Sequence, residues 1–231
     1  MEAPRREPAP DATPGVTAEG GVVIARGRRV FLRTLAPGDL DDLSEWAEDP
    51  FLERMVGSEF LRTYKHAYDK HPSFYEACLN DPTQVVLVIM AVRRTEPRAK
   101  KPLGLVRLFN IHLIEGYAFL ETILTDEKAM RRGFGVEAGK LVCAYGLDVL
   151  GLRRIEAKVY EYNLLSINSL RRHGFRQEGV LRKAGYHAGQ HFDVLVFGIL
   201  REELEEQRKK EVDQEHFHFP YVSDEGPGEP P

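Results

Sequence analysis

The sequence predicts an α/β (α+β) fold in which one mixed sheet of about seven strands carries about four helices. Two observations lead to this fold class. Short apolar runs of strand length alternate along the chain with segments whose apolar residues recur at helical spacing. The chain has 231 residues, of which 42% are hydrophobic and 29% charged, which suits one sizeable globular domain.

The first third of the chain predicts one strand and two helices. RRVFLR, at 28–33, is typical of a strand. Over 39–48 the apolar positions follow a helical period, and Pro50 is expected to stop that helix. A second helix is expected from about residue 73 to residue 80, whereas 56–72 has no clear period.

The middle of the chain predicts three consecutive strands. VVLVIMAV, at 85–92, is a continuous branched apolar run, which is typical of a buried strand. A charged connection at 93–101 follows it. The segments 102–112 and 117–124 are the next two strands, joined by a short turn.

The last third predicts two helices and three strands. A long helix over about 134–150 carries one apolar stripe. A strand at 154–160 and a short helix at 165–173 follow, and a glycine caps the end of that helix. Strands at 175–182 and 192–200 close the domain.

The folded domain is expected to span 22–208. Residues 1–21 are rich in Pro, Ala, Gly and charge and have almost nothing to bury, which predicts a disordered arm. Residues 209–231 are acidic and proline-rich at the close, which predicts a flexible tail.

Composition argues against several classes of partner. The net charge of −4 gives no basic field for nucleic acid. No apolar run approaches the roughly 20 residues that cross a bilayer, and the N-terminus lacks the apolar stretch of a secretory signal. We therefore expect a cytoplasmic protein with neither a nucleic-acid nor a membrane partner.

Cysteine and histidine usage predicts no metal site. Cys78 and Cys143 are too few for a disulfide framework or a four-cysteine zinc site. Cys143 lies on the stripe of the long helix and is expected in the core. His216 and His218 are too few to hold a metal on their own.

MRRGFGVEAG, at 130–139, is the first candidate binding site, because it lies between a strand and a helix. Glycines let the backbone approach a ligand closely, and the first turn of a helix has unpartnered N–H groups and a positive dipole end. Together with the charge of Arg131 and Arg132 these features suit a phosphate. The segment lacks the full P-loop and dinucleotide patterns. A phosphate-binding loop and a basic turn that starts a helix therefore both remain open.

A second segment, NLLSINSLRRHGFRQEG at 163–179, follows about 30 residues later. In this order, the two segments resemble the GNAT superfamily of N-acetyltransferases, in which the first segment is the pyrophosphate loop for acetyl-CoA. Gly133 and Gly135 match the small positions of its pattern, (Gln/Arg)-x-x-Gly-x-(Gly/Ala). Met130 departs from the first position of that pattern.

The details are similar to the branch that acetylates the N-termini of ribosomal proteins. GFGVEA resembles the GYATEA of that branch. Asn163 and Ser166, with the GF and EG dipeptides after them, match its N-x-x-S…GF-x-x-EG run, and Asp193 matches a late Asp before an apolar strand. The resemblance covers about 28–203.

The resemblance implies a GNAT-like, mostly antiparallel sheet whose fourth and fifth strands, here 117–124 and 154–160, splay apart. The pantetheine arm of acetyl-CoA is implied to lie in that gap, with Asn163 bracing it or the strand end. Because Met130 has no side-chain donor, most pyrophosphate contacts are expected from backbone N–H groups of 131–136. The implied cofactor-binding residues are Ile123, Leu124, Thr125, Met130, Arg131, Arg132, Gly133, Phe134, Gly135, Val136, Asn163 and Ser166.

The implied function is an acetyl-CoA-dependent N-acetyltransferase. It would transfer acetyl to a primary amine, of a protein N-terminus or of a small molecule, by direct attack in a ternary complex. A non-catalytic acyl-CoA-binding or protein-interaction domain on the same fold is the alternative. Because many relatives form dimers, a homodimer is also implied. The segments 56–72 and 183–191 are expected to line the acceptor side.

The reaction requires a neutral amine, and a lysine-like amine titrates near 10.4 and an α-amine near 7.7–8.0, so a general base helps. Glu121 is the candidate base, as the one carboxylate in an apolar strand; a carboxylate paired with an arginine is an equally open interpretation. Ser166 is the candidate acid, because Leu170 occupies the position of the family's usual tyrosine. Its alternative role is to cap the helix.

Some members of the branch that this sequence resembles have a glutamate base at the position that is Gly185 here. His187, His191 and Asp193 lie in the same segment and are the substitutes that remain. A loop histidine that is simply solvated is the alternative for each histidine.

Overall fold

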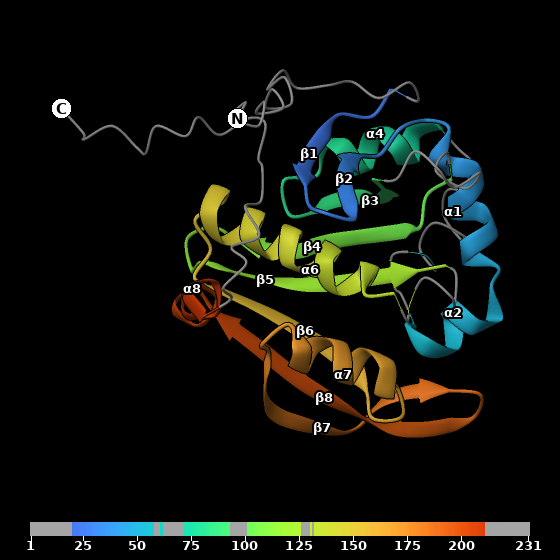
Figure 1. Ribbon diagram of the computed structural model, residues 1–231. Coiled ribbons are helices and arrows are strands. Elements are labelled where there is room, and N and C mark those ends of the chain that lie inside the picture. The colour runs from blue at the N-terminus through green and yellow to red at the C-terminus, as the bar shows by residue number, and fades with distance from the viewer. Residues whose placement is uncertain are drawn as a thin grey trace, which may run out of the picture.

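A single eight-stranded sheet forms the centre of the molecule (Figure 1). The computed structural model describes residues 20–57, 61, 72–92, 101–125, 130 and 132–210. The strand order is β1-β2-β3-β4-β5-β6-β8-β7, and neighbouring strands are antiparallel except for the parallel pair β5 and β6. The strands are β1 (Val23–Arg26), β2 (Val30–Thr34), β3 (Val85–Ala91), β4 (Gly104–His112), β5 (Tyr117–Leu124), β6 (Arg154–Tyr160), β7 (Arg176–His187) and β8 (Gln190–Leu200).

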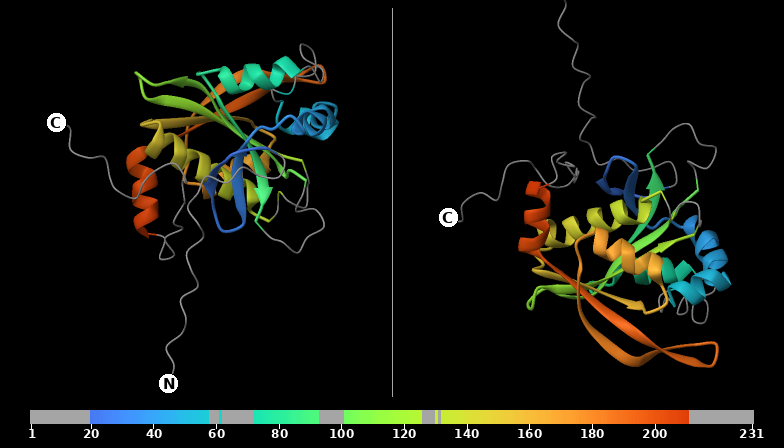
Figure 2. Two further views of the ribbon diagram at one scale, coloured as in Figure 1. Left: turned by 90° about the horizontal axis from the view of Figure 1, so that it is seen from above. Right: turned by 60° about the horizontal axis from the view of Figure 1, so that its bottom comes forward.

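Helices cover both faces of this sheet (Figure 2). They are α1 (Asp39–Ala47), α2 (Pro50–Met55), α4 (Pro72–Asn80), α6 (Phe134–Ala144) with its π-helical extension η2 (Tyr145–Val149), α7 (Leu164–Arg172) and α8 (Arg201–Lys210). α6 and α7 pack on one face, and α1, α2 and α4 on the other. The predicted mixed, mostly antiparallel sheet with flanking helices is confirmed. None of the helices described here is long and apolar enough to cross a membrane.

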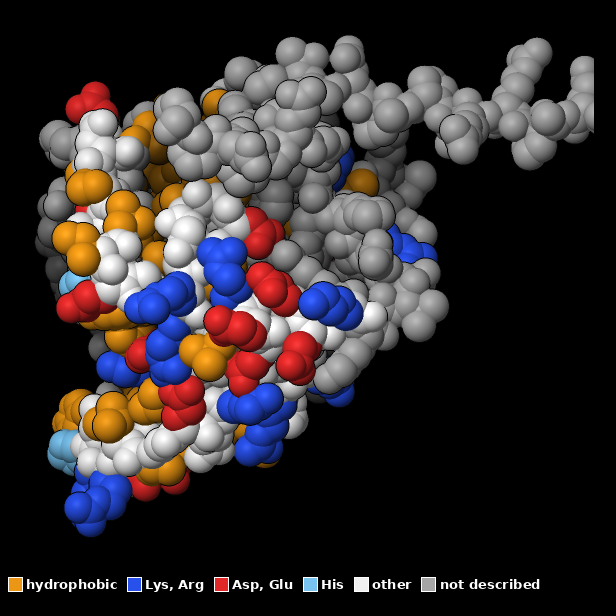
Figure 3. All heavy atoms as spheres, turned by 90° about the vertical axis from the view of Figure 1, so that its left-hand side faces the viewer, with side chains coloured by type: hydrophobic (Ala, Val, Ile, Leu, Met, Phe, Trp, Pro, Cys, Tyr) orange, Lys and Arg blue, Asp and Glu red, His pale blue; other side chains and the backbone are white. Residues whose placement is uncertain are grey.

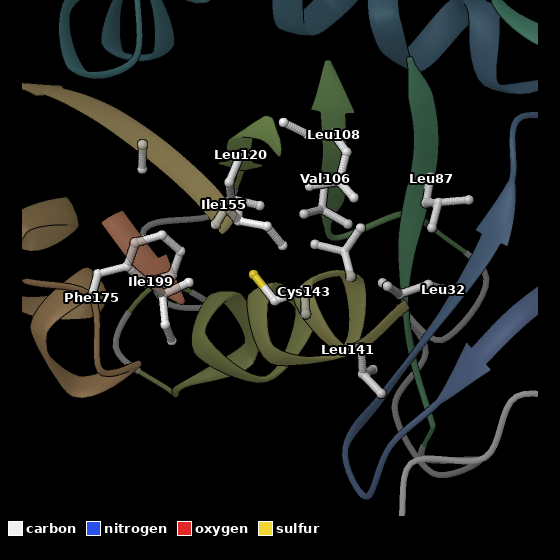
Figure 4. Packing of buried hydrophobic residues seen from close by; sticks show 14 of the residues in the cluster. Leu32, Leu87, Val106, Leu108, Leu120, Leu141, Cys143, Ile155, Phe175 and Ile199 are labelled. Atoms are coloured by element: carbon white, nitrogen blue, oxygen red, sulfur yellow. The ribbon is translucent and has the colours of Figure 1, made fainter. Parts of the chain in front are cut away.

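β3 is buried on both faces, as its continuous apolar run predicts. Leu87 and Ile89 belong to the larger core cluster under α6, whereas Val86 and Val88 belong to the smaller cluster under α1, α2 and α4. Cys143 points from α6 towards the sheet within the larger cluster (Figure 4). It is fully buried, so its predicted place in the core is confirmed.

The predicted splay lies between β5 and β6. The two strands pair in parallel only where Tyr117–Phe119 faces Arg154–Glu156. Across its other edge β5 pairs with β4 as far as Leu124. The half of β5 from Leu120 to Leu124 therefore has an edge that β6 does not occupy, which we call the open edge.

Two expectations near the N-terminus need correction. The structure has an extra strand, β1, and the predicted strand at 28–33 is in fact the turn between β1 and β2 followed by most of β2. Pro50 ends α1 but also begins α2, because proline fits the first helical position and the Asp49 carboxylate accepts the N–H groups of Phe51 and Leu52.

The C-terminal strands are longer than expected. β7 and β8 form a hairpin that projects from the sheet (Figure 2), so most of the segment 183–191, which lies between the two expected strands, is itself strand. Ala188 and Gly189, both at positive φ (47° and 81°), make its two-residue turn. α8 then extends to Lys210, and the face on that side mixes acidic and basic side chains (Figure 3). The predicted arm (except residues 20 and 21) and the predicted tail from 211 lie outside the described residues.

Candidate active site

The open edge of β5 presents backbone polar groups. The Thr125 N–H donates to the Leu103 carbonyl on the β4 side (3.0 Å), and the Ile123 carbonyl also faces β4, 1.9 Å from where a Cβ on Gly104 would lie. Successive residues of a strand direct their N–H and C=O groups to opposite edges. Of the three residues predicted to meet the thioester, Leu124 is therefore the one whose backbone groups point to the open edge.

The first turn of α6 packs against this half of β5. A Cβ on Gly135 would lie 3.0 Å from Leu124 Cδ1 and 3.8 Å from Thr122 Cγ2, so glycine allows this close approach. Gly133, the N-cap, has a left-handed φ of 78°, and no side chain caps the helix. The N–H groups of the first turn have no partner within the helix. These donors and the positive end of the helix dipole fit a diphosphate.

A buried carboxylate ties the β1–β2 turn to this helix. Glu137, 2% exposed, accepts at Oε1 from the backbone N–H groups of Arg29 (2.7 Å) and Val30 (3.3 Å). Its Oε2 accepts from Arg29 Nε (2.9 Å), and Arg29 Nη1 donates to the Arg132 carbonyl (2.9 Å). A Cβ on Gly27 would lie 2.4 Å from Oε1, so a glycine is required there.

Sequence reasoning missed Glu137 and Arg29. The only local signal was one acidic residue in the first turn of a helix that is otherwise apolar on that side. Arg29 and Glu137 are 108 positions apart in the sequence, so no motif within either segment predicts their contact.

The other predicted loop residues take different positions. Met130 is partly buried and packs against the larger core cluster. Phe134 belongs to that cluster, and the guanidinium carbon of exposed Arg132 lies 5.2 Å from its ring centroid. Val136 is half-buried, and Arg131 lies outside the described residues.

Asn163 joins three elements at the end of β6. It is buried and is the N-cap of α7, where Oδ1 accepts the Ser166 N–H (3.0 Å). Its Nδ2 donates to the Met55 carbonyl (2.6 Å) at the end of α2, and the neighbouring Tyr162 hydroxyl donates to the Arg54 carbonyl (2.7 Å). Capping α7 is therefore the role of Asn163 and not of Ser166, which is half-buried in the first turn.

Glu121 pairs with an arginine, as one of the two open interpretations expected. Its Oε2 accepts from Arg107 Nε at 2.6 Å, and both side chains are mostly buried. The Arg107 guanidinium also lies 4.2 Å from the Phe109 ring centroid. Burial raises the pKa of nearby Cys78 to about 12, which keeps that thiol protonated and makes it a poor nucleophile. The ion pair with Arg107 is compatible with either interpretation of Glu121, the general base or a structural carboxylate.

An aromatic cluster stands where β6 ends. The ring of Tyr160 fits between Gly57 and Gly185, where Cβ atoms would lie 2.7 Å from its hydroxyl oxygen and 2.5 Å from Cε1. Tyr160 stacks on Tyr162 (5.4 Å), which meets Phe192 edge-on (4.8 Å). Gly185 therefore makes room for Tyr160, which explains physically why no glutamate side chain stands at that position.

The three substitute candidates belong to the β7–β8 hairpin. His187 and His191 lie beside its turn. Asp193 accepts the Lys183 N–H at Oδ1 (2.8 Å), and its own N–H donates to Glu161 Oε1 (3.0 Å), so its carboxylate braces the hairpin. Within the described ranges, no group of three or more His, Cys, Asp or Glu residues could hold a metal ion; His216 and His218 lie beyond them.

The proteins that this chain resembles are described as acetyltransferases. A family model described as an acetyltransferase (GNAT) domain matches residues 29–176. The α/β-tubulin-N-acetyltransferase 9 of Mus musculus is 26% identical over 157 residues, which cover 65% of this chain and 63% of that protein. The uncharacterized N-acetyltransferase YoaA of Bacillus subtilis (strain 168) is 41% identical over 71 residues, 31% of this chain and 40% of that protein. The matches thus span less than two thirds of these relatives' own length.

Solved structures agree on the fold. The spermidine N-acetyltransferase of Vibrio cholerae, in complex with CoA and spermine, superposes with a TM-score of 0.66 at 21% identity, covering 76% of this chain and 98% of that one. The family match at 29–176 includes β5 with its open edge, the loop at 130–139 and the start of α7. The chain belongs to the GNAT acetyltransferase family.

Proposed function

We propose that this protein transfers the acetyl group of acetyl-CoA to a primary amine by direct attack within a ternary complex. The observation that carries the proposal is the juxtaposition of the open edge of β5 with the uncapped first turn of α6. One element offers backbone groups to an extended chain, and the other offers N–H groups to a diphosphate. Acetyl-CoA has both parts in one molecule and supplies an activated acyl group when bound.

The residues that would hold acetyl-CoA follow from this arrangement. The N–H groups from Gly133 to Val136 would bind the pyrophosphate, with Arg131 and Arg132 adding charge. The backbone of Leu124 would pair with the pantetheine arm or orient the thioester carbonyl, with Ile123 and Thr125 fixing the strand on its other edge.

We assign Glu121 as the general base and Ser166 as the acid for the departing thiolate. The Glu121 carboxylate, held by Arg107 Nε at 2.6 Å, would take a proton from the amine directly or through water. Ser166 is held in the first turn of α7 by its N–H bond to Asn163. Asn163 would brace the strand end, and its remaining hydrogen-bonding capacity could reach the pantetheine arm.

The acceptor is a protein N-terminus or a small-molecule amine. One relative is named for a protein, tubulin, and one structure of the same fold is named for a small-molecule amine, spermidine. The motif resemblance to the branch that acetylates the N-termini of ribosomal proteins favours a protein N-terminus. We place the acceptor at the Tyr160 cluster and the end of α2, on the face of the sheet opposite α6.

The test is acetyl transfer to a panel of peptides with free N-termini and of polyamines, read by mass spectrometry together with CoA release. Glu121→Gln should lower kcat about a hundred-fold or more while acetyl-CoA binds with unchanged affinity. Glu115→Gln, on the exposed β4–β5 turn, is the matched control. Unchanged turnover in Glu121→Gln would remove the base assignment. Tight acetyl-CoA binding with no product from any amine would favour the non-catalytic alternative.

A further inference from the structure

The pyrophosphate loop lacks its expected side-chain donor. Met130 stands where the family pattern has Gln or Arg, and its side chain packs against the core cluster. It can neither donate a hydrogen bond nor carry charge. The loop therefore has only its backbone and the arginines that follow Met130, unless another part of the chain supplies a donor.

The β1–β2 turn brings another arginine to the loop. Arg29 Nη1 donates to the carbonyl of Arg132, the residue just before the N-cap. A Cβ on Gly133 would lie 3.3 Å from Nη1 and 3.6 Å from Nη2 of the same guanidinium. The planar group thus lies directly against the turn from which the first N–H groups of α6 project.

This guanidinium is held firmly and still has donors to offer. Glu137 Oε2 fixes Nε at 2.9 Å, and the Glu137 carboxylate is itself fixed by two backbone N–H groups of the same turn. An arginine has five N–H donors, of which the contacts to Glu137 and Arg132 use two. The side chain remains 52% exposed, so its outer edge reaches solvent.

We propose that Arg29 is a pyrophosphate-binding residue, supplying from the β1–β2 turn the side-chain cation that Met130 cannot supply. This inference rests on the proposed function. Glu137 is the positioning residue, because it acts through Arg29. The arrangement also compensates the Glu137 carboxylate, whose charge would otherwise repel a diphosphate at the same helix end.

The test compares ligands that differ in their phosphates. Isothermal titration with CoA and with 3′-dephospho-CoA, and ligand-observed NMR with pantetheine, are run on the wild type and on Arg29→Met. Arg29→Met should weaken CoA and 3′-dephospho-CoA equally, by about ten- to a hundred-fold, and leave pantetheine unchanged. Arg28→Met removes the same charge from the same turn and should alter none of them by more than about three-fold.

Three results would overturn the proposal. Unchanged affinity in Arg29→Met would make Arg29 a brace for the turn only. A loss for CoA but not for 3′-dephospho-CoA would assign it to the 3′-phosphate instead. An equal loss for pantetheine in a folded Arg29→Met protein would show that Arg29 supports the binding site as a whole and not the pyrophosphate in particular.

A measurement on the wild type covers the case in which Arg29→Met does not fold. Phenylglyoxal modification of Arg29, followed by mass spectrometry, should be blocked by CoA and by 3′-dephospho-CoA but not by pantetheine. Modification of Arg29 that 3′-dephospho-CoA does not slow would contradict the proposal. A wild type that binds no CoA at all is a different result, because it would remove the proposed function itself.

Discussion

The two ends of the candidate site are built in different ways. At the end we assign to the cofactor, α6, β5 and the β1–β2 turn join through an apolar core and one buried carboxylate, Glu137. At the end we assign to the acceptor, α2, β6 and the hairpin join through side-chain bonds to backbone carbonyls and through the ring of Tyr160. The shared core of the cofactor end suits a ligand that is the same in every reaction, acetyl-CoA. At the acceptor end a single substitution can change one contact without disturbing the core, which suits an acceptor that differs between proteins.

The largest expected effect lies at the cofactor end. The Glu137 carboxylate accepts hydrogen bonds from two backbone N–H groups and from the Arg29 side chain. Glu137→Ala leaves these three donors without their acceptor. The free energy of unfolding should fall by about 3–5 kcal/mol, measured by urea denaturation. Glu205→Ala, at an exposed site on α8, should change it by less than about 0.5 kcal/mol. A loss below about 1 kcal/mol in Glu137→Ala would contradict a structural role for this carboxylate.

A buried histidine makes the same end sensitive to acid. Burial, with a smaller contribution from Lys140, lowers the pKa of His173 to about 3, and its ring packs beside Gly139 of α6. The unfolded chain takes up this proton below about 6.5, whereas the folded chain does not. Stability is therefore fully present above pH 6.5 and falls as the pH drops, approaching about 1.4 kcal/mol per pH unit.

Urea denaturation from pH 7 to pH 5 checks this slope. His173→Phe should lose less stability over that range than the wild type, by about 2 kcal/mol at pH 5. His112→Asn, at an exposed position, should follow the wild type. Parallel curves for His173→Phe and the wild type would show that His173 is not the responsible group.

The acceptor end should respond more weakly. Asn163→Ala removes the α7 cap and the bond to the Met55 carbonyl, which should lower stability by about 1–2 kcal/mol. Because α2 is released, the KM for the amine should rise more than the Kd for CoA. Asn168→Ala, exposed on the same helix, is the control. An equal loss in both ligands would show that the two ends are not separable at Asn163.

The smallest effect concerns two glycine N-caps that differ in backbone conformation. Gly133 caps α6 at φ 78°, so Gly133→Ala should cost about 1 kcal/mol. Gly38 caps α1 at φ −65° with open space around it, so Gly38→Ala should be neutral or slightly stabilising. Thermal unfolding of the two variants checks the difference, and equal midpoints would contradict it.

The sequence predicted what depends on local pattern. The branched run at 85–92, the apolar stripe of α6 and the glycines at 133 and 135 each have a local period or a turn chemistry. β1 was missed because four residues next to a glycine carry little signal. The length of β7 was missed because an edge strand that is exposed on most of its positions has no clean alternation.

The parts of the site that could be predicted are also those that depend on local sequence pattern. The Asn–Ser spacing at the start of α7 is local, although the cap proved to be Asn163. Glu121 was recognisable as a charge in an apolar strand, but its Arg107 partner comes from the neighbouring strand. The contact of Glu137 with Arg29 depends on tertiary packing alone.

The central claim is that the open edge of β5 and the first turn of α6 together hold acetyl-CoA. The most direct measurement is a titration of acetyl-CoA into isotopically labelled protein, followed by backbone amide NMR. We expect the largest shifts at the amides of Leu124 and of Phe134 to Val136, with small shifts at the β7–β8 turn. Shifts centred elsewhere, or none at saturating acetyl-CoA, would contradict it.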